Sequence, residues 1–275
     1  METDVQTCYR HDDRRAGVRC QRCDRPICPA CMHQASVGFH CPECTRAAPQ
    51  RVVSARSLAG ASRPVAALAI IAVNLAVWFA DLPSVNDVMN GIGRIGGDAA
   101  LYGPAVAAGD WWRPLTAGFV HAGPLHVGFN MFLLWRLAQI LEPAVKWTGF
   151  VALYVMSLVG GSLAVLLISP NEVTVGASGA VFGLMAAAFV AMRSRGIDPF
   201  STGIGPLIVL NLVLTFAVPG ISVGGHVGGL ITGAVGGWLL WVWAPRLGPP
   251  LARTVPPLVC LALAGVLYAG CLAVA

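Results

Sequence analysis

The sequence has 275 residues, of which 56% are hydrophobic and 11% are charged, and its mean hydropathy is +0.69. Soluble domains carry about 25% charged residues, so the composition excludes a purely soluble protein and places most of the chain in lipid. The net charge of +5 comes from basic residues spread over loops, which suits a membrane-orientation signal and argues against nucleic-acid binding. The polar N-terminal segment lacks the apolar run of a signal peptide, so we expect no cleaved leader.

Seven of the nine cysteines lie between Cys8 and Cys44, and this odd number in closely spaced pairs favours metal binding over disulfides. The candidate ligands form four pairs, each with a two-residue gap: Cys8 and His11, Cys20 and Cys23, Cys28 and Cys31, and Cys41 and Cys44. Each gap lets a tight knuckle direct two donors at one tetrahedral zinc ion, so eight ligands predict two zinc sites. We expect the first pair to join the third and the second to join the fourth, although His33 or His40 could replace a ligand.

Residues 1–45 therefore form a predicted zinc-binding domain. It has too little apolar content for a core, so bound metal should supply most of its folding free energy. The segment resembles the B-box class of zinc fingers, whose members mostly mediate protein contacts. The resemblance implies a cytoplasmic protein partner, while a purely structural role fits the residues equally well.

Residues 46–63 are polar and without apolar periodicity, and we interpret them as a linker. Seven apolar stretches follow, each close to the roughly 20 residues that a helix needs to cross a bilayer. We expect membrane helices at 64–80, 118–141, 148–169, 176–192, 203–219, 224–244 and 256–275. The fold class is thus an all-α polytopic membrane protein, with a six-helix core at 64–244 and an inner loop and seventh helix at 245–275.

The basic residues of the loops predict the orientation of these helices, because cytoplasmic loops carry an excess of Lys and Arg. With the zinc segment in the cytoplasm, every predicted inner loop is basic, and the outer loops after the third and fifth helices contain no Lys or Arg. The inner residues are Arg136, Lys146, Arg193, Arg195, Arg246 and Arg253, and the long first outer loop holds Arg94 and Arg113. We expect a multi-pass protein of the cell membrane with its N-terminus inside and its C-terminus outside.

Four polar side chains are predicted to lie at one depth near the outer surface. The second, fourth and sixth helices all run inward, and their outer ends carry His126 and Asn130, Ser178, and His226 respectively. Polar groups inside a membrane are costly, face the protein interior and are usually functional. Ser178 stands in the small-residue turn 176–179 (Gly-Ala-Ser-Gly), which suits a nucleophile whose backbone N–H faces a reacting carbonyl.

Glycines explain how the fourth and sixth helices could approach each other. Gly179 and Gly183 form a GxxxG motif on the fourth helix, and Gly229, Gly233 and Gly237 repeat the spacing on the sixth. Small residues at this spacing let helix backbones pack closely, which would bring the Ser178 hydroxyl within reach of the His226 ring. Alternatively, the glycines serve ordinary packing and His226 is a hydrogen-bonded structural histidine.

The chain from about residue 64 to 244 resembles the rhomboid family of intramembrane serine proteases. The motifs that carry the resemblance are Trp112-Arg113, His121-x4-His126-x3-Asn130, Gly176-Ala177-Ser178-Gly179 and His226-x2-Gly229-x3-Gly233. A seventh helix after the six-helix core is similar to the "6+1" form of that family. The resemblance implies a protease that cleaves single-pass transmembrane helices near the outer face, with no cofactor for catalysis.

The resemblance also implies roles for individual residues. Ser178 would be the nucleophile and His226 its general base, a dyad without an acidic third member. Asn130, His126 and the backbone N–H of Ser178 would form the oxyanion hole. Trp112 and Arg113 would be structural, and Glu142 would stabilise the core. Phe182 stands where a tyrosine often packs on the catalytic histidine, so ring stacking should persist, and the fifth helix would be the lateral gate.

Two other functions compete with a protease. The first is a catalytically silent rhomboid-like scaffold that binds membrane helices and hands them to partners through its zinc domain. Such pseudoenzymes usually lose the serine or the histidine, and this chain keeps both Ser178 and His226. The second is a transporter, which would carry internal repeats and buried acidic groups that the predicted helices lack.

Overall fold

The computed structural model describes residues 6–35, 38–47, 63–82 and 91–275. The chain forms two compact units, Met1–Ala61 and Ser62–Ala275. Most of the predicted linker, residues 48–62, lies outside the described residues. The expected architecture, an all-α membrane protein preceded by a small cysteine-rich unit, is confirmed.

The described residues of the N-terminal unit form three short antiparallel hairpins and one helical turn at each of two cysteine pairs. The elements are β1 (Thr7–Cys8) with β2 (His11–Arg15), β3 (Val18–Arg19) with β4 (Pro26–Ile27), β5 (His33–Gln34) with β6 (Phe39–His40), the 3-10 turn η1 (Pro29–Cys31) and α1 (Pro42–Ala47). Apart from Ile27, the side chains of its core are mainly cysteines. Such a unit buries little apolar surface, so its core contributes little to its stability.

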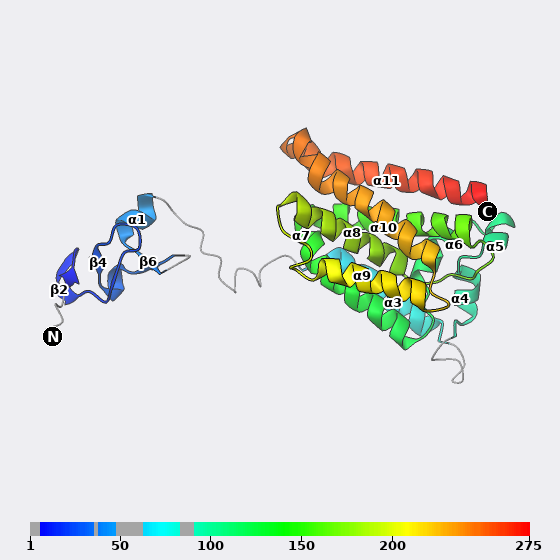
Figure 1. Cartoon of the computed structure of the whole chain (residues 1–275), viewed down its shortest axis with the longest axis horizontal. Coiled ribbons are helices and arrows are strands. Elements are labelled where there is room, and N and C mark those ends of the chain that lie inside the picture. Colours follow the sequence, from blue (N-terminus) through cyan, green and yellow to red (C-terminus); the bar gives the residue numbers. More distant parts are fainter. Residues whose placement is uncertain (1–5, 36–37, 48–62, 83–90) are drawn as a thin grey trace. The chain divides into compact units, whose positions relative to one another are not determined.

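The second unit is a bundle of apolar helices. Its long elements are α3 (Val65–Ala80), α7 (Pro124–Ile168), α8 (Ser178–Ser194), α9 (Ile204–Ala217), α10 (Val223–Trp238), continued by the π-helical turn η3 (Leu239–Trp243), and α11 (Pro249–Val274) (Figure 1). Short helices occupy the loop between α3 and α7: α4 (Arg94–Ala99), α5 (Gly103–Ala107), α6 (Arg113–Thr116) and η2 (Ala117–Phe119). The 3-10 turn η4 (Ala244–Leu247) leads into α11.

Helix α7 is two membrane helices in one element, because Lys146 has the left-handed angles φ 63° and ψ 173°. Its second half returns toward its beginning, since the Ser162 hydroxyl donates to the carbonyl of Pro114 at 2.7 Å. Counting these halves separately, the described residues contain the seven apolar helical segments that the sequence predicts. Of these, α8, α9 and α3 are shorter than a full bilayer span.

Two predicted boundaries were wrong. The second span begins at Pro124 rather than at 118, because the η2 turn ends at Phe119 and Gly123 adopts a φ of 85° that interrupts a helix. The seventh begins at Pro249, and Pro256 and Pro257 lie within it. A proline interrupts the bonding of the preceding turn, and the surrounding helix continues across both residues.

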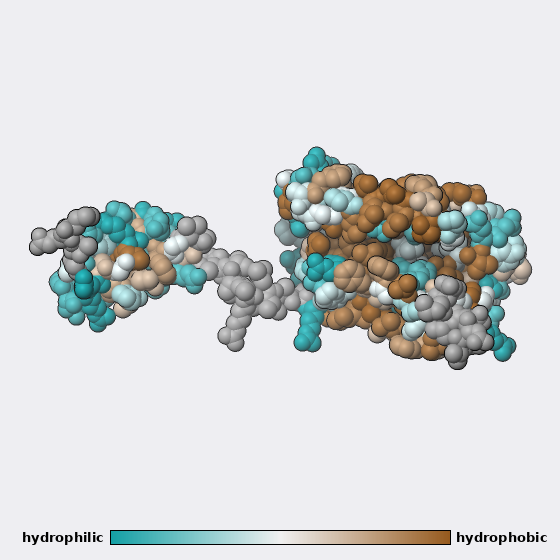
Figure 2. All heavy atoms as spheres, turned by 60° about the horizontal axis from the view of Figure 1, so that its bottom comes forward, coloured by the Kyte–Doolittle hydropathy of each residue, from teal (hydrophilic) through white to brown (hydrophobic). Residues whose placement is uncertain are grey.

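Helix α8 lies at the centre of the bundle (Figure 1) and is buried along most of its length, including Ala180, Leu184 and Ala187. A helix with small and apolar residues all round is typical of such a position. On the outside, apolar side chains cover much of the face of the helical unit seen in Figure 2. Phe129, Phe216 and Leu258 are among the exposed residues of this unit. An apolar exterior of this extent suits a lipid environment.

Candidate active site

A cavity of about 700 Å³ opens among α7, α8, α9 and α10. Ser178, His226, His126 and Asn130, the polar residues that the sequence analysis placed at one depth, all line this cavity. The remaining lining is largely apolar and includes Phe182. A concave, mostly apolar cavity with a few converging polar groups is the usual form of a ligand site.

The turn before α8 presents Ser178 to the cavity. Gly176 has φ +118°, a conformation that L side chains rarely adopt, and a Cβ there would lie 2.6 Å from Nε2 of His126. The turn is held by two hydrogen bonds: the Gly176 N–H donates to the carbonyl of Ala117 at 2.9 Å, and the Ala177 N–H donates to Nε2 of His121 at 3.3 Å. The positive φ of Gly176 and its closeness to His126 therefore require glycine at this position.

His121 thus braces the turn that carries Ser178, and it is 3% exposed. Its ring lies edge-on to that of His126, with ring centroids 5.0 Å apart. The sequence placed His121 in the motif without assigning it a contact. The observed contact is with the backbone of the serine turn.

The His226 ring is constrained on its face and on its Nδ1 edge. Phe182 stacks on it with ring centroids 4.1 Å apart and an interplanar angle of 19°. Nδ1 of His226 lies 2.7 Å from Oγ1 of Thr215 on α9. Sequence reasoning missed Thr215, which belongs to none of the motifs that it singled out.

Ser178 and His226 share the cavity without a direct hydrogen bond between them in the described part of the chain. The ring position is nevertheless fixed by its neighbours. In substrate-free enzymes such contacts are often long and tighten only when substrate binds. The arrangement can therefore support activation of a serine by an imidazole.

His126 presents a hydrogen-bond donor to the same region. Its Nδ1 accepts from the N–H of Ala122 at 3.3 Å, so in a neutral ring the proton resides on Nε2. A Cβ built on Gly176 would lie 3.7 Å from Ser178 Oγ and 2.6 Å from this Nε2, so both atoms border one point. The amide nitrogen of Asn130 donates to the carbonyl of His126 at 2.9 Å, which orients the amide along α7.

Trp112 and Arg113 fasten the loop that precedes α7. The indole N–H of Trp112 donates to the carbonyl of Asp98 at 3.1 Å. Arg113 is 9% exposed; its guanidinium pairs with Asp110 at 2.8 Å and donates to the carbonyls of Gly97 and Ala100 at 2.9 and 2.8 Å. These contacts involve only the loop itself, so both residues act on its shape.

The glycines of α8 and α10 bring the two backbones together. A Cβ on Gly179 would lie 3.0 Å from the carbonyl oxygen of Gly225. One on Gly229 would overlap the carbonyl of Gly179, and one on Gly233 would overlap the backbone of Gly183. Side chains at these positions would separate the helices and so move Ser178 away from His226.

Comparison with known proteins agrees with this geometry. Residues 108–243 match the family model described as "Rhomboid domain". "Rhomboid protease GluP" of Bacillus subtilis (strain 168) is 36% identical over 169 residues, which cover 60% of this chain and 33% of GluP. "Putative rhomboid protease YdcA" of the same organism is 33% identical over 143 residues, which cover 50% of this chain and 70% of YdcA.

This chain belongs to the rhomboid family. "Rhomboid-like protease 1" of Toxoplasma gondii is 32% identical over 173 residues, which cover 56% of this chain and 59% of that protein. The chain thus spans about a third of GluP and less than two thirds of the Toxoplasma relative. The match begins at residue 108, so the family resemblance concerns the helical unit.

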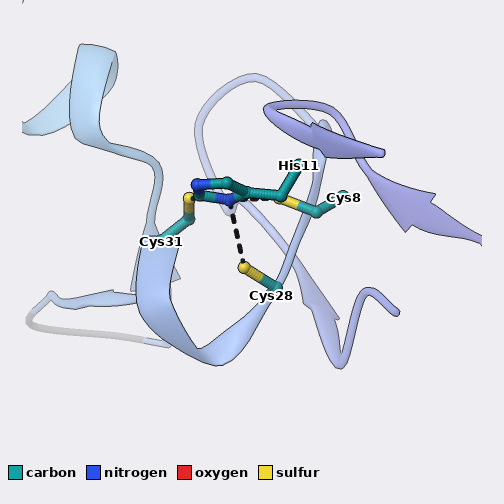
Figure 3. A group of neighbouring side chains, drawn as sticks. All are labelled: Cys8, His11, Cys28 and Cys31. Atoms are coloured by element: carbon teal, nitrogen blue, oxygen red, sulfur yellow. Dashed lines mark hydrogen bonds between the residues drawn. The ribbon is translucent and has the colours of Figure 1, made fainter. Parts of the chain in front are cut away.

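The N-terminal unit of this rhomboid gathers its cysteines into two groups. Cys8, His11, Cys28 and Cys31 form one, and Cys20, Cys23, Cys41 and Cys44 form the other, with the ligand atoms of each group within 4.8 Å of one another. In Figure 3 the side chains of the first group converge from the β1–β2 hairpin and the η1 turn. The first pair thus meets the third and the second meets the fourth, the arrangement expected above, and His33 and His40 lie in β5 and β6, outside both groups.

The geometry of both groups fits a tetrahedral metal ion. Nδ1 of His11 lies 3.8, 3.5 and 3.3 Å from the sulfurs of Cys8, Cys28 and Cys31. In the second group the sulfurs of Cys23 and Cys41 are 3.7 Å apart. Sulfurs that bind one zinc ion at about 2.3 Å are separated by about 3.8 Å, so either group could hold such an ion.

The pKa values of the thiols differ within the first group. Burial alone would raise the pKa of Cys8, but backbone hydrogen bonds, including that of Arg10, outweigh it and lower this pKa to about 6. Burial and the neighbouring Cys8 raise the pKa of Cys31 to about 11. A metal binds thiolates, so its binding must displace a proton from Cys31 at neutral pH.

Proposed function

We propose that this chain is an intramembrane serine endopeptidase that cleaves transmembrane helices of membrane proteins near the outer face, using Ser178 and His226. The observation that carries the proposal is that these residues and two candidate oxyanion donors, His126 and Asn130, line one cavity. The protease names of the relatives support the same reaction class at the level of the family.

In this mechanism Ser178 Oγ attacks the carbonyl carbon of the scissile peptide bond, and its proton passes to Nε2 of His226. The oxyanion that forms accepts hydrogen bonds from Nε2–H of His126, the amide of Asn130 and the backbone N–H of Ser178. His226 then donates its proton to the leaving amine, which breaks the peptide bond and leaves an acyl-enzyme. Water, deprotonated by His226, hydrolyses that ester.

The substrate proposed is a single-pass membrane protein whose helix opens locally beside the cavity. A helical peptide bond is shielded, and its hydrogen bonds must open before a serine can attack it. Helix α9 is proposed as the lateral gate, since the buried residues along it are Ile204, Gly205 and Thr215. A helix with so little buried surface separates from a bundle at low free-energy cost.

Orientation and the N-terminal unit complete the proposal. The loop charges support a cell-membrane protein with its N-terminus and Cys/His unit in the cytoplasm and its C-terminus outside. Two zinc ions are proposed in the two groups of ligands, with a structural role. The unit is further proposed to bind a cytoplasmic protein, and no nucleic acid is expected as a partner.

The test is cleavage of a reconstituted single-pass substrate by the wild type beside Ser178→Ala and His226→Ala. Matched controls are Ser194→Ala, at the opposite end of α8, and His33→Ala, in the N-terminal unit. We expect both controls to cut like the wild type and both site variants to lose at least about 10³-fold in rate.

If no substrate is cut, labelling of Ser178 by a fluorophosphonate distinguishes an active protease given the wrong substrate from a catalytically silent scaffold. A labelled wild type with an unlabelled His226→Ala would retain the proposed chemistry and reject the substrate. An unlabelled wild type, folded and carrying the intact cavity, would contradict the protease and favour the helix-binding scaffold.

A further inference from the structure

Thr215 is a buried residue of α9, one of the helices that border the cavity. Its side chain lies in the outer half of α9 and is 2% exposed, whereas Leu214 and Phe216 beside it are 44% and 67% exposed. Oγ1 of Thr215 lies 2.7 Å from the carbonyl oxygen of Asn211 and 2.7 Å from Nδ1 of His226. The hydroxyl therefore bridges the backbone of α9 and the imidazole of α10.

The protons of this bridge determine the tautomer of His226. A threonine hydroxyl has one proton to donate, and a backbone carbonyl can only accept. The Asn211 carbonyl and Nδ1 of His226 lie equally close to Oγ1, at 2.7 Å, and both contacts are hydrogen bonds only if the Thr215 proton goes to the carbonyl. The second contact then requires Nδ1–H of His226 to donate to a lone pair of Oγ1.

With the proton on Nδ1, the neutral His226 ring carries its free lone pair on Nε2. That is the form needed by a base that takes a proton from a serine hydroxyl, because Nε2 must accept it. The stacked ring of Phe182 holds the plane of the imidazole, and Thr215 holds its rotation within that plane. In serine proteases with a third member, a buried carboxylate does both tasks at Nδ1.

We propose that Thr215 is a positioning residue for the proposed protease: through Nδ1 it holds the His226 ring in the tautomer and orientation in which Nε2 faces Ser178. The inference rests on the proposed function. In the proposed arrangement, a neutral hydroxyl contacts Nδ1, where serine proteases with a third member have a carboxylate. This hydroxyl belongs to α9, the proposed gate helix. Displacement of α9 would consequently release the ring of the general base.

The decisive comparison is between Thr215→Val and Thr215→Ser. Valine keeps the shape of threonine and removes the hydroxyl, whereas serine keeps the hydroxyl and removes the methyl group. We expect Thr215→Val to lower kcat for a reconstituted substrate, and the rate of fluorophosphonate labelling, by about tenfold to 100-fold, because a buried donor loses its partner. KM should stay unchanged, and Thr215→Ser should remain within about threefold of the wild type.

Thr232→Val is the matched control. Thr232 on α10 also donates to the carbonyl four residues before it, that of Gly228 at 2.8 Å, and its hydroxyl contacts no histidine among the described residues. We expect this variant to retain wild-type rates. Nitrogen-15 histidine spectra, with the His226 signal assigned by its loss in His226→Ala, should show Nδ1–H in the wild type and a mixture of tautomers in Thr215→Val.

The outcomes separate this inference from the proposed function. Loss of rate in Thr215→Ser comparable to that in Thr215→Val would indicate packing and overturn the inference. Wild-type rates and an unchanged His226 tautomer in Thr215→Val would also overturn the inference. In that case, labelling of the wild type would still support the protease proposal. If the wild type is not labelled at all, both proposals fail.

Discussion

Glu142 offers a stability test whose magnitude follows from its contacts. This residue in α7 is 6% exposed, and its two carboxylate oxygens accept the N–H groups of Ala66 and Ala67 at 2.9 and 3.1 Å. Those N–H groups belong to the first turn of α3, where helix donors have no partner within the helix. The carboxylate thus caps α3 from a helix far away in the sequence.

Glu142→Gln should destabilise the helical unit by about 2–4 kcal/mol. The amide keeps the size of the side chain but offers only one acceptor, so one buried N–H loses a charge-assisted bond of about 1.5–3 kcal/mol. The negative charge at the N-terminus of α3 adds about 0.3–1 kcal/mol, which the variant also loses. The residue lies away from the cavity lining, so labelling of Ser178 at low temperature should be unaffected.

The assay is thermal unfolding of the detergent-solubilised protein, followed by loss of Ser178 labelling after heating. Asp98→Asn, which changes an exposed side chain on α4, is the matched control for removal of one negative charge. We expect a lower midpoint for Glu142→Gln and an unchanged one for the control. Equal midpoints for Glu142→Gln and the wild type would refute the capping argument.

Three further outcomes are expected. Gly176→Ala should reduce labelling of Ser178 by more than tenfold, because residue 176 has a φ of +118° and an added Cβ would collide with His126. The control Gly196→Ala, with φ +71° and no atom near its added Cβ, should be labelled like the wild type. Equal labelling of Gly176→Ala and the wild type would contradict the turn argument. Gly229→Ala should lower the midpoint of thermal unfolding, since its Cβ would overlap the backbone of α8. An unchanged midpoint would contradict close packing of α8 against α10. Native mass spectrometry should find two zinc ions per chain. A chelator, or a fall in pH that protonates the thiolates, should release these ions and unfold the N-terminal unit alone. An N-terminal unit that stays folded without metal would exclude a structural role for zinc.

Much of the membrane unit was predictable from local signals. Apolar stretches of bilayer length indicate helices whatever their neighbours are, because backbone groups in lipid must bond within their own segment. The two-residue gap between Cys8 and His11 likewise restricts both donors to one ion. Family membership followed from short motifs such as His121-x4-His126-x3-Asn130, and the matched rhomboid domain confirmed it.

Boundaries and long-range contacts were not predictable in the same way. Residues 118–123 were expected to begin a membrane helix, yet Gly123 has a φ of 85°, and α7 starts only after it. The family resemblance implied a stabilising role for Glu142, while its partners on α3 emerge only when the helices pack. Hydropathy contains no information on which helix a buried carboxylate will reach.

Sequence alone determined the number of apolar helices and the Cys/His pairs, because each depends on spacing along one chain segment. Tertiary structure decided what touches the His226 ring. A threonine in an apolar helix usually bonds its own backbone, as Thr232 does, and nothing in the sequence distinguishes Thr215 from it. The packing of α9 against α10 brings Oγ1 of Thr215 to Nδ1 of His226, and a contact between two helices exists only once their rotation and separation are set.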